Sequence, residues 1–523
     1  MFKYIYSAVV VLSINLGYAQ HIFKARNFWI QQDVQLAMDF LDIKEPGSQF
    51  HSSFKPYLSG YCTDFKDSLA FSSVSHNRFL KPKYYMGLGQ FTWESTPIIN
   101  GSFSRAHKTS AYDFTYGTEH AFLVKSNLAF VLNWSNTWSQ HYLLGDSSWI
   151  ALNQTSSLGL ITDRNRQKQR LSSELYQGYI SFNPGSSKYF NLQAGKGKHV
   201  VGDGFRSLLH SDNAPAYPYA QISAKAWRLQ YHVWYAALQH QSPIDPASLL
   251  KKYATFHYLS YKGPKGFQLG FFESVIWAGT DSLRYRTWDV TYLNPVIFLR
   301  PVEYHNGSPD NVIMGLNGSA VFFKTLKVYA QFALDEFLLK EIFAGNNWWG
   351  NKYAWQLGAK IRLQKNILIQ TEYNRIRPFT YSHMYTAQNY AHAGYALAHP
   401  NGSNLNEMFF QAIYRHRRMA FNVLCINRLQ GIENPSENLG NNLFKSYNSR
   451  PRDYNFGIAL SPRSNTTILQ SGLGYLLQAQ HNLWFKISGW ISQNIDKQTV
   501  IKTGFQVSLT SGLWNNPVFP VNQ

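Results

Sequence analysis

Stretches of about ten residues in which apolar and polar side chains alternate restrict the possible folds more than any other feature. In Thr499–Leu509, apolar residues such as Ile501 and Phe505 alternate with polar ones such as Lys502 and Gln506. Similar alternation occurs in Leu326–Leu334, Tyr353–Leu363, Asn366–Tyr373 and Leu483–Ile491. Alternate side chains of a strand point to opposite faces, so each of these strands has one apolar and one polar face. Such strands are typical of a barrel that spans a membrane.

Weaker runs of the same kind bring the total to about 16–18 antiparallel strands. Short basic turns separate some of them, as at Lys262–Gly266, Lys324-Thr325, Gln364-Lys365 and Arg415–Arg418. Long irregular stretches separate others, namely 139–173, 195–219, 293–311, 336–351, 377–406 and 430–453. We therefore expect an all-β fold, a transmembrane outer-membrane β-barrel over residues 81–514, with one simple and one elaborate rim. Residues 515–523 form a polar C-terminal tail.

The composition agrees with a membrane barrel. Aromatic residues make up 16% of the chain, and such barrels carry aromatic girdles at both membrane interfaces. The mean hydropathy is −0.30, as expected when polar residues fill the lumen. We find no apolar run of 18 residues after the N-terminus, so we expect no transmembrane helix.

The N-terminus reads as a secretory signal, with Lys3 before the apolar run Ile5–Leu16 and a cleavage site near Ala19. Residues 1–19 are thus a signal peptide, and residues 20–80 an N-terminal periplasmic segment that is helical and then extended. Apolar residues recur at helical spacing over Asn27–Lys44. The two cysteines, Cys62 and Cys425, lack metal-ligand spacing, and their pairing is left open.

The stretch Gly195–Tyr219 is rich in glycine, proline and polar residues, and we interpret it as a shaped loop. Arg206 is suited to an acidic group, and His210, Asp212 and Asn213 to sugar hydroxyls. A structural loop that only plugs the barrel is the alternative, with Arg206 and Asp212 paired to the wall.

This loop also carries a resemblance. The pattern from Gly202-Asp203-Gly204-Phe205-Arg206 through Ser211-Asp212-Asn213 to Tyr217-Pro218-Tyr219 resembles the signature region of the Wzi family of capsule-assembly outer-membrane barrels. It is most similar to the branch of gliding, Bacteroidetes-type bacteria that includes the gliding-motility protein RemB. Further stretches with this resemblance are Asn294–Tyr304, Asp335–Gly350, Arg377–His383 and Ala398–Gly402. The resemblance implies a non-enzymatic barrel that holds surface polysaccharide.

Other candidate sites lie in the remaining loops. Asp335, Glu336, Trp348 and Trp349 lie in a stretch whose aromatic rings stand beside the amides of Asn346 and Asn347, as in a sugar platform, although girdle tryptophans are the alternative. Arg300, Glu303 and Asp310 suit either a pore constriction or a salt-bridged rim.

Metal and enzyme chemistry are disfavoured. His383, His392 and His399 have spacings that fit no metal-ligand pair, and we expect no metal or cofactor. His399 is kept as a candidate polysaccharide contact. No G-x-S-x-G motif is present, and the chain is not predicted to be an enzyme.

The net charge of +20 indicates anionic partners or a solvated surface. We expect contacts with surface polysaccharide or lipopolysaccharide and with outer-membrane lipids, and no nucleic acid. An adhesin or the secretion machinery is a further expected partner. The expected function is polysaccharide anchoring at the cell surface. The alternatives are a gliding-motility or adhesion protein and a porin-like diffusion channel.

Overall fold

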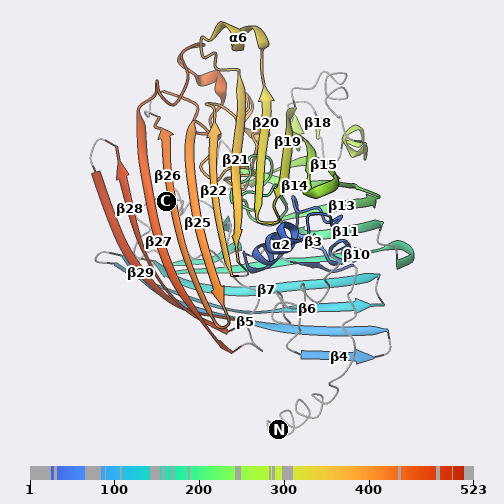
Figure 1. Ribbon diagram of the computed structural model, residues 1–523. Coiled ribbons are helices and arrows are strands. Elements are labelled where there is room, and N and C mark those ends of the chain that lie inside the picture. The colour runs from blue at the N-terminus through green and yellow to red at the C-terminus, as the bar shows by residue number, and fades with distance from the viewer. Residues whose placement is uncertain are drawn as a thin grey trace.

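The protein forms a closed antiparallel β-barrel (Figure 1). The computed structural model describes residues 25–28, 32–64, 84–88, 90–106, 109–125, 127–141, 154–155, 159–165, 170–186, 189–241, 249–281, 284–285, 289–296, 310–364, 366–433, 437–478, 483–496 and 499–511. Within this part of the chain, the wall contains 18 strands, and β29 pairs with β5 to close it. The fold predicted from the alternating pattern is confirmed. The predicted signal peptide and C-terminal tail lie outside the described residues.

The wall strands follow one another in chain order. They are β5 (Phe91–Ala106), β6 (Thr109–Val124), β7 (Leu128–His141), β10 (Arg170–Phe182), β11 (Phe190–Gly197), β13 (Tyr217–Ala226), β14 (Leu229–Gln241), β15 (Leu249–Lys262), β16 (Gln268–Ala278), β19 (Asn311–Phe322), β20 (Leu326–Glu336), β21 (Lys352–Leu363), β22 (Ile367–Ile376), β25 (Leu405–His416), β26 (Met419–Gly431), β27 (Arg463–Gln478), β28 (Leu483–Ile495) and β29 (Thr499–Thr510).

Smaller elements lie along the edges and inside. β4 (Tyr84–Leu88) extends the sheet beside β5, and β8 (Gln154–Thr155) and β9 (Gly159–Asn165) extend it beside β10. Separate two-stranded pairs are β1 (Asn27–Phe28) with β3 (Tyr57–Leu58), β2 (Phe54–Lys55) with β12 (Val200–Val201), β17 (Thr280–Asp281) with β18 (Arg284–Tyr285), and β23 (Ala391–His392) with β24 (Tyr395–Ala396). The α-helices within the described residues are α2 (Gln32–Lys44) and α6 (Leu339–Ala344). Among the described residues, no helix is long and apolar enough to span a membrane.

The two faces of the wall differ as the alternating pattern predicts. On β20 and β21, the outward side chains of Phe332 and Leu357 are exposed, whereas the inward side chains of Gln331, Gln356 and Lys360 are buried. Exposed leucine and phenylalanine on the outside suit lipid, and buried polar groups inside need partners within the lumen.

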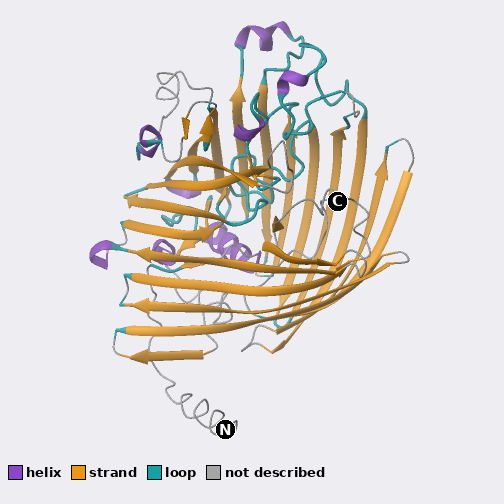
Figure 2. Cartoon of the chain, turned by 180° about the vertical axis from the view of Figure 1, so that it is seen from behind, coloured by secondary structure: helices purple, strands orange, loops and turns teal. Residues whose placement is uncertain are grey.

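The connections separate the two rims. At one rim the turns are short, as at Trp227-Arg228, Phe323–Thr325 and Arg417-Arg418. The opposite rim carries most of the long connections, including residues 198–216, 377–404 and 432–462 (Figure 2). Both ends of the predicted loop 195–219 differ from the prediction, because Gly195–Gly197 belongs to β11 and Tyr217–Tyr219 belongs to β13. Pro218 had suggested a loop, but proline is tolerated near the beginning of a strand.

Candidate functional site

Residues 32–64 lie inside the barrel, and α2 is surrounded by wall strands (Figures 1 and 2). The predicted helix is therefore present, and it lies in the lumen, where it packs against the inner face of the wall. Leu36 and Ile43 of α2 are buried against Val321 and Leu368 of the wall. The extended part pairs with the loop that follows β11, since Val200 lies opposite Lys55 and Val201 opposite Phe54.

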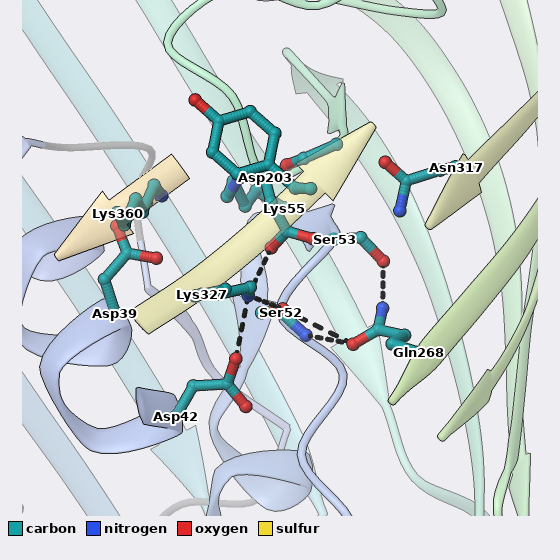
Figure 3. A network of polar contacts seen from close by, with 12 residues as sticks. Asp39, Asp42, Ser52, Ser53, Lys55, Asp203, Gln268, Asn317, Lys327 and Lys360 are labelled. Atoms are coloured by element: carbon teal, nitrogen blue, oxygen red, sulfur yellow. Dashed lines mark hydrogen bonds and ion pairs between the residues drawn. The ribbon is translucent and has the colours of Figure 1, made fainter. Parts of the chain in front are cut away.

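Lys327 of β20 contacts both the N-terminal residues inside the barrel and the loop that follows β11 (Figure 3). Its Nζ atom lies 2.8 Å from Oδ2 of Asp42, 2.8 Å from Oδ1 of Asp203 and 2.7 Å from Oγ of Ser52. Lys262 contacts the other oxygen of Asp42 at 2.8 Å. Lys327, Lys262 and Asp42 have side chains that are 0% exposed. An unpaired charge would be costly at this depth, so the network fixes both segments to the wall.

The electrostatics of this network favour the ionised carboxylates. Burial alone would raise the pKa of Asp203, but the ammonium groups of Lys327 and Lys55 outweigh burial and hold this pKa below its usual range. The pKa of Asp42 is also lowered, because Lys262 and Lys327 outweigh the effect of burial. Burial lowers the pKa of Lys55 to about 8.

The loop of residues 198–216, here called the inner loop, crosses the lumen and is held by wall carboxylates and amides. Glu372 accepts hydrogen bonds from the backbone N–H groups of Phe205 at 2.8 Å and Arg206 at 3.1 Å. Glu407 accepts a hydrogen bond from Nε of Arg206 at 2.9 Å. Gln331 accepts one from the N–H of Leu208 at 2.8 Å. One of the two predicted alternatives paired both Arg206 and Asp212 with the wall; this pairing is observed for Arg206, whereas Asp212 is exposed.

The loop of residues 377–404, here called the cover loop, packs on the inner loop. The hydroxyl group of Tyr381 donates to the backbone carbonyl of Leu208 at 2.7 Å. The hydroxyl group of Tyr390 donates to the backbone carbonyl of Leu209, also at 2.7 Å. Its His399 contacts Glu407 at 3.1 Å, so a single wall carboxylate binds both loops.

A buried histidine and tyrosine cluster lies at the base of the inner loop. The hydroxyl oxygen of Tyr217 is 3.0 Å from Nδ1 of His199 and 2.7 Å from Nε2 of His210. Burial lowers the pKa of His199 to about 3 and that of His210 well below its usual value. Both histidines are therefore neutral at pH 7, and they pack the lumen as uncharged rings.

A third layer, residues 437–461, lies on the cover loop at the long-loop rim. The backbone N–H of Phe379 donates to the carbonyl of Gly440 at 2.8 Å. Trp349 packs against Tyr447 with ring centroids 4.7 Å apart. The guanidinium of Arg450 lies 4.0 Å from the ring centroid of Trp349. Trp349 therefore joins two loops, and the neighbouring Trp348 remains partly exposed.

The predicted site residues fall into separate environments. Asp310 is buried and accepts hydrogen bonds from Tyr292 and Gln388. Asp335 is buried 3.2 Å from Lys352, which also contacts the partly exposed Glu336. Residues buried and held by protein partners are His210, Asp310, Asp335 and His399, while Arg206 is partly buried against Glu407. Asp212 is exposed, and Asn213 is partly exposed and donates to the carbonyl of Ala396 at 3.0 Å. Arg300 and Glu303 lie outside the described residues.

The wall residues that organise this site were missed in the sequence. Lys327, Glu372 and Glu407 each occupy a lumen-facing position of a strand, as Lys360 does. A charged residue on the lumen face is ordinary in a barrel, so only its partner makes it informative. Among the described residues, no group of three or more His, Cys, Asp or Glu side chains is placed to hold a metal ion.

Comparison with known proteins relates the fold, and only the fold, to solved structures. No protein-family model and no curated protein matches the sequence. The chain is similar to Wzi of Escherichia coli, an outer-membrane protein involved in group 1 capsule assembly and described as a carbohydrate-binding β-barrel. The TM-score is 0.57 at 11% identity, and the alignment covers 92% of this chain and 99% of that one. The outer-membrane protein OprD of Pseudomonas aeruginosa matches with a TM-score of 0.44 at 10% identity, over 80% of this chain and 94% of that one.

Proposed function

We propose that the protein is an outer-membrane barrel that binds polysaccharide at the cell surface, with its long-loop rim outside and its short-turn rim in the periplasm. The observation that carries this proposal is the filling of the lumen. The inner loop and residues 32–64 are joined to the wall by buried ion pairs, and the cover loop packs on the inner loop. A barrel built in this way is suited to presenting a fixed outer surface.

The likeness in fold to Wzi supports polysaccharide as the ligand, because that neighbour is described as carbohydrate binding. Within this proposal, exposed side chains at the rim contact the glycan, and Asp212, Asn213, Glu336 and Trp348 are the candidates. Arg206, His210, Asp310, Asp335, Trp349 and His399 hold the loops that carry them. Arg300 and Glu303 remain predicted contacts. Lipopolysaccharide and outer-membrane lipids are proposed partners, since the outward faces of the strands are apolar.

The other functions are less well supported by the geometry. A diffusion channel needs an open lumen, whereas buried ion pairs fix the inner loop of this chain across it. A role in gliding or adhesion, with an adhesin or secretion machinery as partner, rests on the sequence resemblance alone.

The test is to delete the gene and measure cell-attached against released polysaccharide. We expect more released polysaccharide in the deletion strain, with total synthesis unchanged, and restoration by the wild-type gene. An unchanged ratio of attached to released polysaccharide would contradict the proposal.

A further inference from the structure

One sector of the long-loop rim carries only short connections. Residues 107–108 join β5 to β6, and residues 496–498 join β28 to β29. Since β5 ends at Ala106, the first residues of β29, Thr499–Thr503, extend beyond the residues that pair with β5. This part of the rim, here called the low sector, therefore has no long connection after β5 or after β28.

Trp490 lies on the lumen face of β28, below this part of the rim. On β28, Ile487 and Ile491 are exposed on the outer face, so Trp490 points into the lumen. Its ring lies against Gly504 of β29, where an added Cβ atom would be 2.6 Å from Cε2 of Trp490. A glycine at this position is what allows the ring to lie so close to the wall. Trp490 remains partly exposed.

The strand position opposite Trp490 carries a side-chain amide. Gln470 of β27 lies directly opposite Trp490 in the strand register and faces the same side. Gln470 is 4% exposed, and its Oε1 atom has no hydrogen-bond partner among the described residues. A buried carbonyl oxygen without a partner costs free energy, which a bound hydroxyl group would recover.

Small polar side chains continue the surface on the next positions of β29 and β5. Gln506 lies opposite Ser104, and Ser508 lies opposite Ser102. Oγ of Ser102 donates to Oδ2 of Asp113 at 3.0 Å. An aromatic ring beside amide and hydroxyl groups is the composition of a carbohydrate site, because the ring takes the apolar face of a sugar and the polar groups take its hydroxyls.

We propose that Trp490, Gln470, Gln506 and Ser104 form a lumen-facing subsite for a neutral sugar unit of the bound glycan, entered from the low sector of the rim. This inference rests on the proposed function and gives it a site that is separate from the inner loop and the cover loop. It also places the ligand on strands β27 to β29 and β5, which follow strands β20 to β26 around the wall.

The experiment measures glycan binding by the full-length barrel in detergent micelles. The probe is an array of capsular and lipopolysaccharide oligosaccharides, followed by calorimetric titration of the oligosaccharide that is bound best. We expect Trp490→Ala to weaken its binding at least about tenfold, as for a buried aromatic anchor. Gly504→Ala keeps the ring but displaces it, and we expect a loss of affinity there too. Heat-modifiable gel mobility confirms that each variant is folded.

Trp227→Ala is the matched control, because Trp227 is 67% exposed in a turn of the opposite rim. We expect it to bind as the wild type does. If Trp490→Ala and Gly504→Ala are folded and also bind as the wild type does, the subsite is wrong and the proposed function stands. If the wild-type barrel binds no oligosaccharide of the array, both the subsite and the proposed function are overturned.

Discussion

Lys327 lies 2.8 Å from the carboxylate of Asp42, although 285 positions separate the two residues in the chain. The contact joins helix α2 to the wall, and the same ammonium group also holds Asp203 of the inner loop. The N-terminal segment and the inner loop are therefore fixed by one shared side chain.

Replacing Lys327 with methionine is expected to release both inward segments while the barrel itself persists. The variant leaves the buried carboxylates of Asp42 and Asp203 with fewer partners, a change that typically costs about 3–5 kcal/mol. Hydrogen exchange should increase in residues 32–64 and 198–216 and remain slow in the wall strands. Lys340→Met, in the exposed helix α6, is the control and should leave both rates unchanged. Unchanged exchange in the Lys327 variant would show that the network does not hold the segments.

Glu407→Gln is expected to loosen the inner loop and the cover loop together. Glu407 contacts Arg206 at 2.9 Å and His399 at 3.1 Å, and these two residues belong to different loops. Loss of its charge leaves Arg206 without its ion-pair partner. Hydrogen exchange of both loops should rise in parallel. Asp453→Asn removes an exposed ion pair with Arg450 and should have little effect. A change confined to one loop would contradict the shared anchoring.

Acid is expected to destabilise the packing of the inner loop in two stages. The pKa values of His199 and His392 are lowered by burial to about 3, so between pH 6.5 and 3 the unfolded chain binds protons that the folded loops do not. Stability therefore falls as the pH is lowered through this window, by about 1.4 kcal/mol per pH unit for each histidine. Below about pH 4, protonation of Asp42 and Asp203, whose pKa values are lowered, removes more stability as the pH falls through their folded-state values.

This loss of stability is measured by hydrogen exchange of residues 198–216 from pH 7.5 to 3.5. The rates are corrected for the intrinsic exchange rate at each pH. The double variant His199→Asn, His392→Asn should lose the share of the dependence between pH 6.5 and 4 that these two histidines contribute, while buried His210 keeps its own share. A wild-type loop whose stability is constant across that window would contradict the assignment of these histidines as buried and neutral.

Because neighbouring residues of β28 face lipid and lumen in turn, substitutions with arginine at adjacent positions should destabilise the barrel to different extents. Ile491 is 49% exposed on the outer face, and Ser492 faces the lumen. Ile491→Arg should lower the free energy of unfolding in lipid vesicles by about 2–4 kcal/mol if it lies near the bilayer centre. Ser492→Arg should cost much less, because the lumen is polar. Equal losses in urea titrations of the two variants would contradict the membrane-facing side assigned to β28.

The sequence predicted the wall better than the interior. Thr499–Leu509 and Leu326–Leu334 were predicted within a few residues of β29 and β20, because a strand between lipid and a polar lumen must alternate. β13 was missed, since Tyr217 and Pro218 read locally as the end of a loop.

The candidate site depends on contacts between distant residues, which no local pattern encodes. Arg206 stands out in the sequence, but its partner Glu407 lies 201 positions away in an ordinary alternating strand. Helix α2 was predicted from its spacing, yet its place inside the barrel follows from Lys262 and Lys327. Trp490 reads as one of many barrel aromatics until the strand register places it against Gly504.

Single-channel conductance of the purified barrel in a planar bilayer tests the central claim most directly. The account predicts that the folded wild-type protein carries no large steady current, and that Lys327→Met produces channel openings because the inward segments are released. Large, steady currents through the wild-type barrel would contradict a closed lumen and would support a diffusion channel instead.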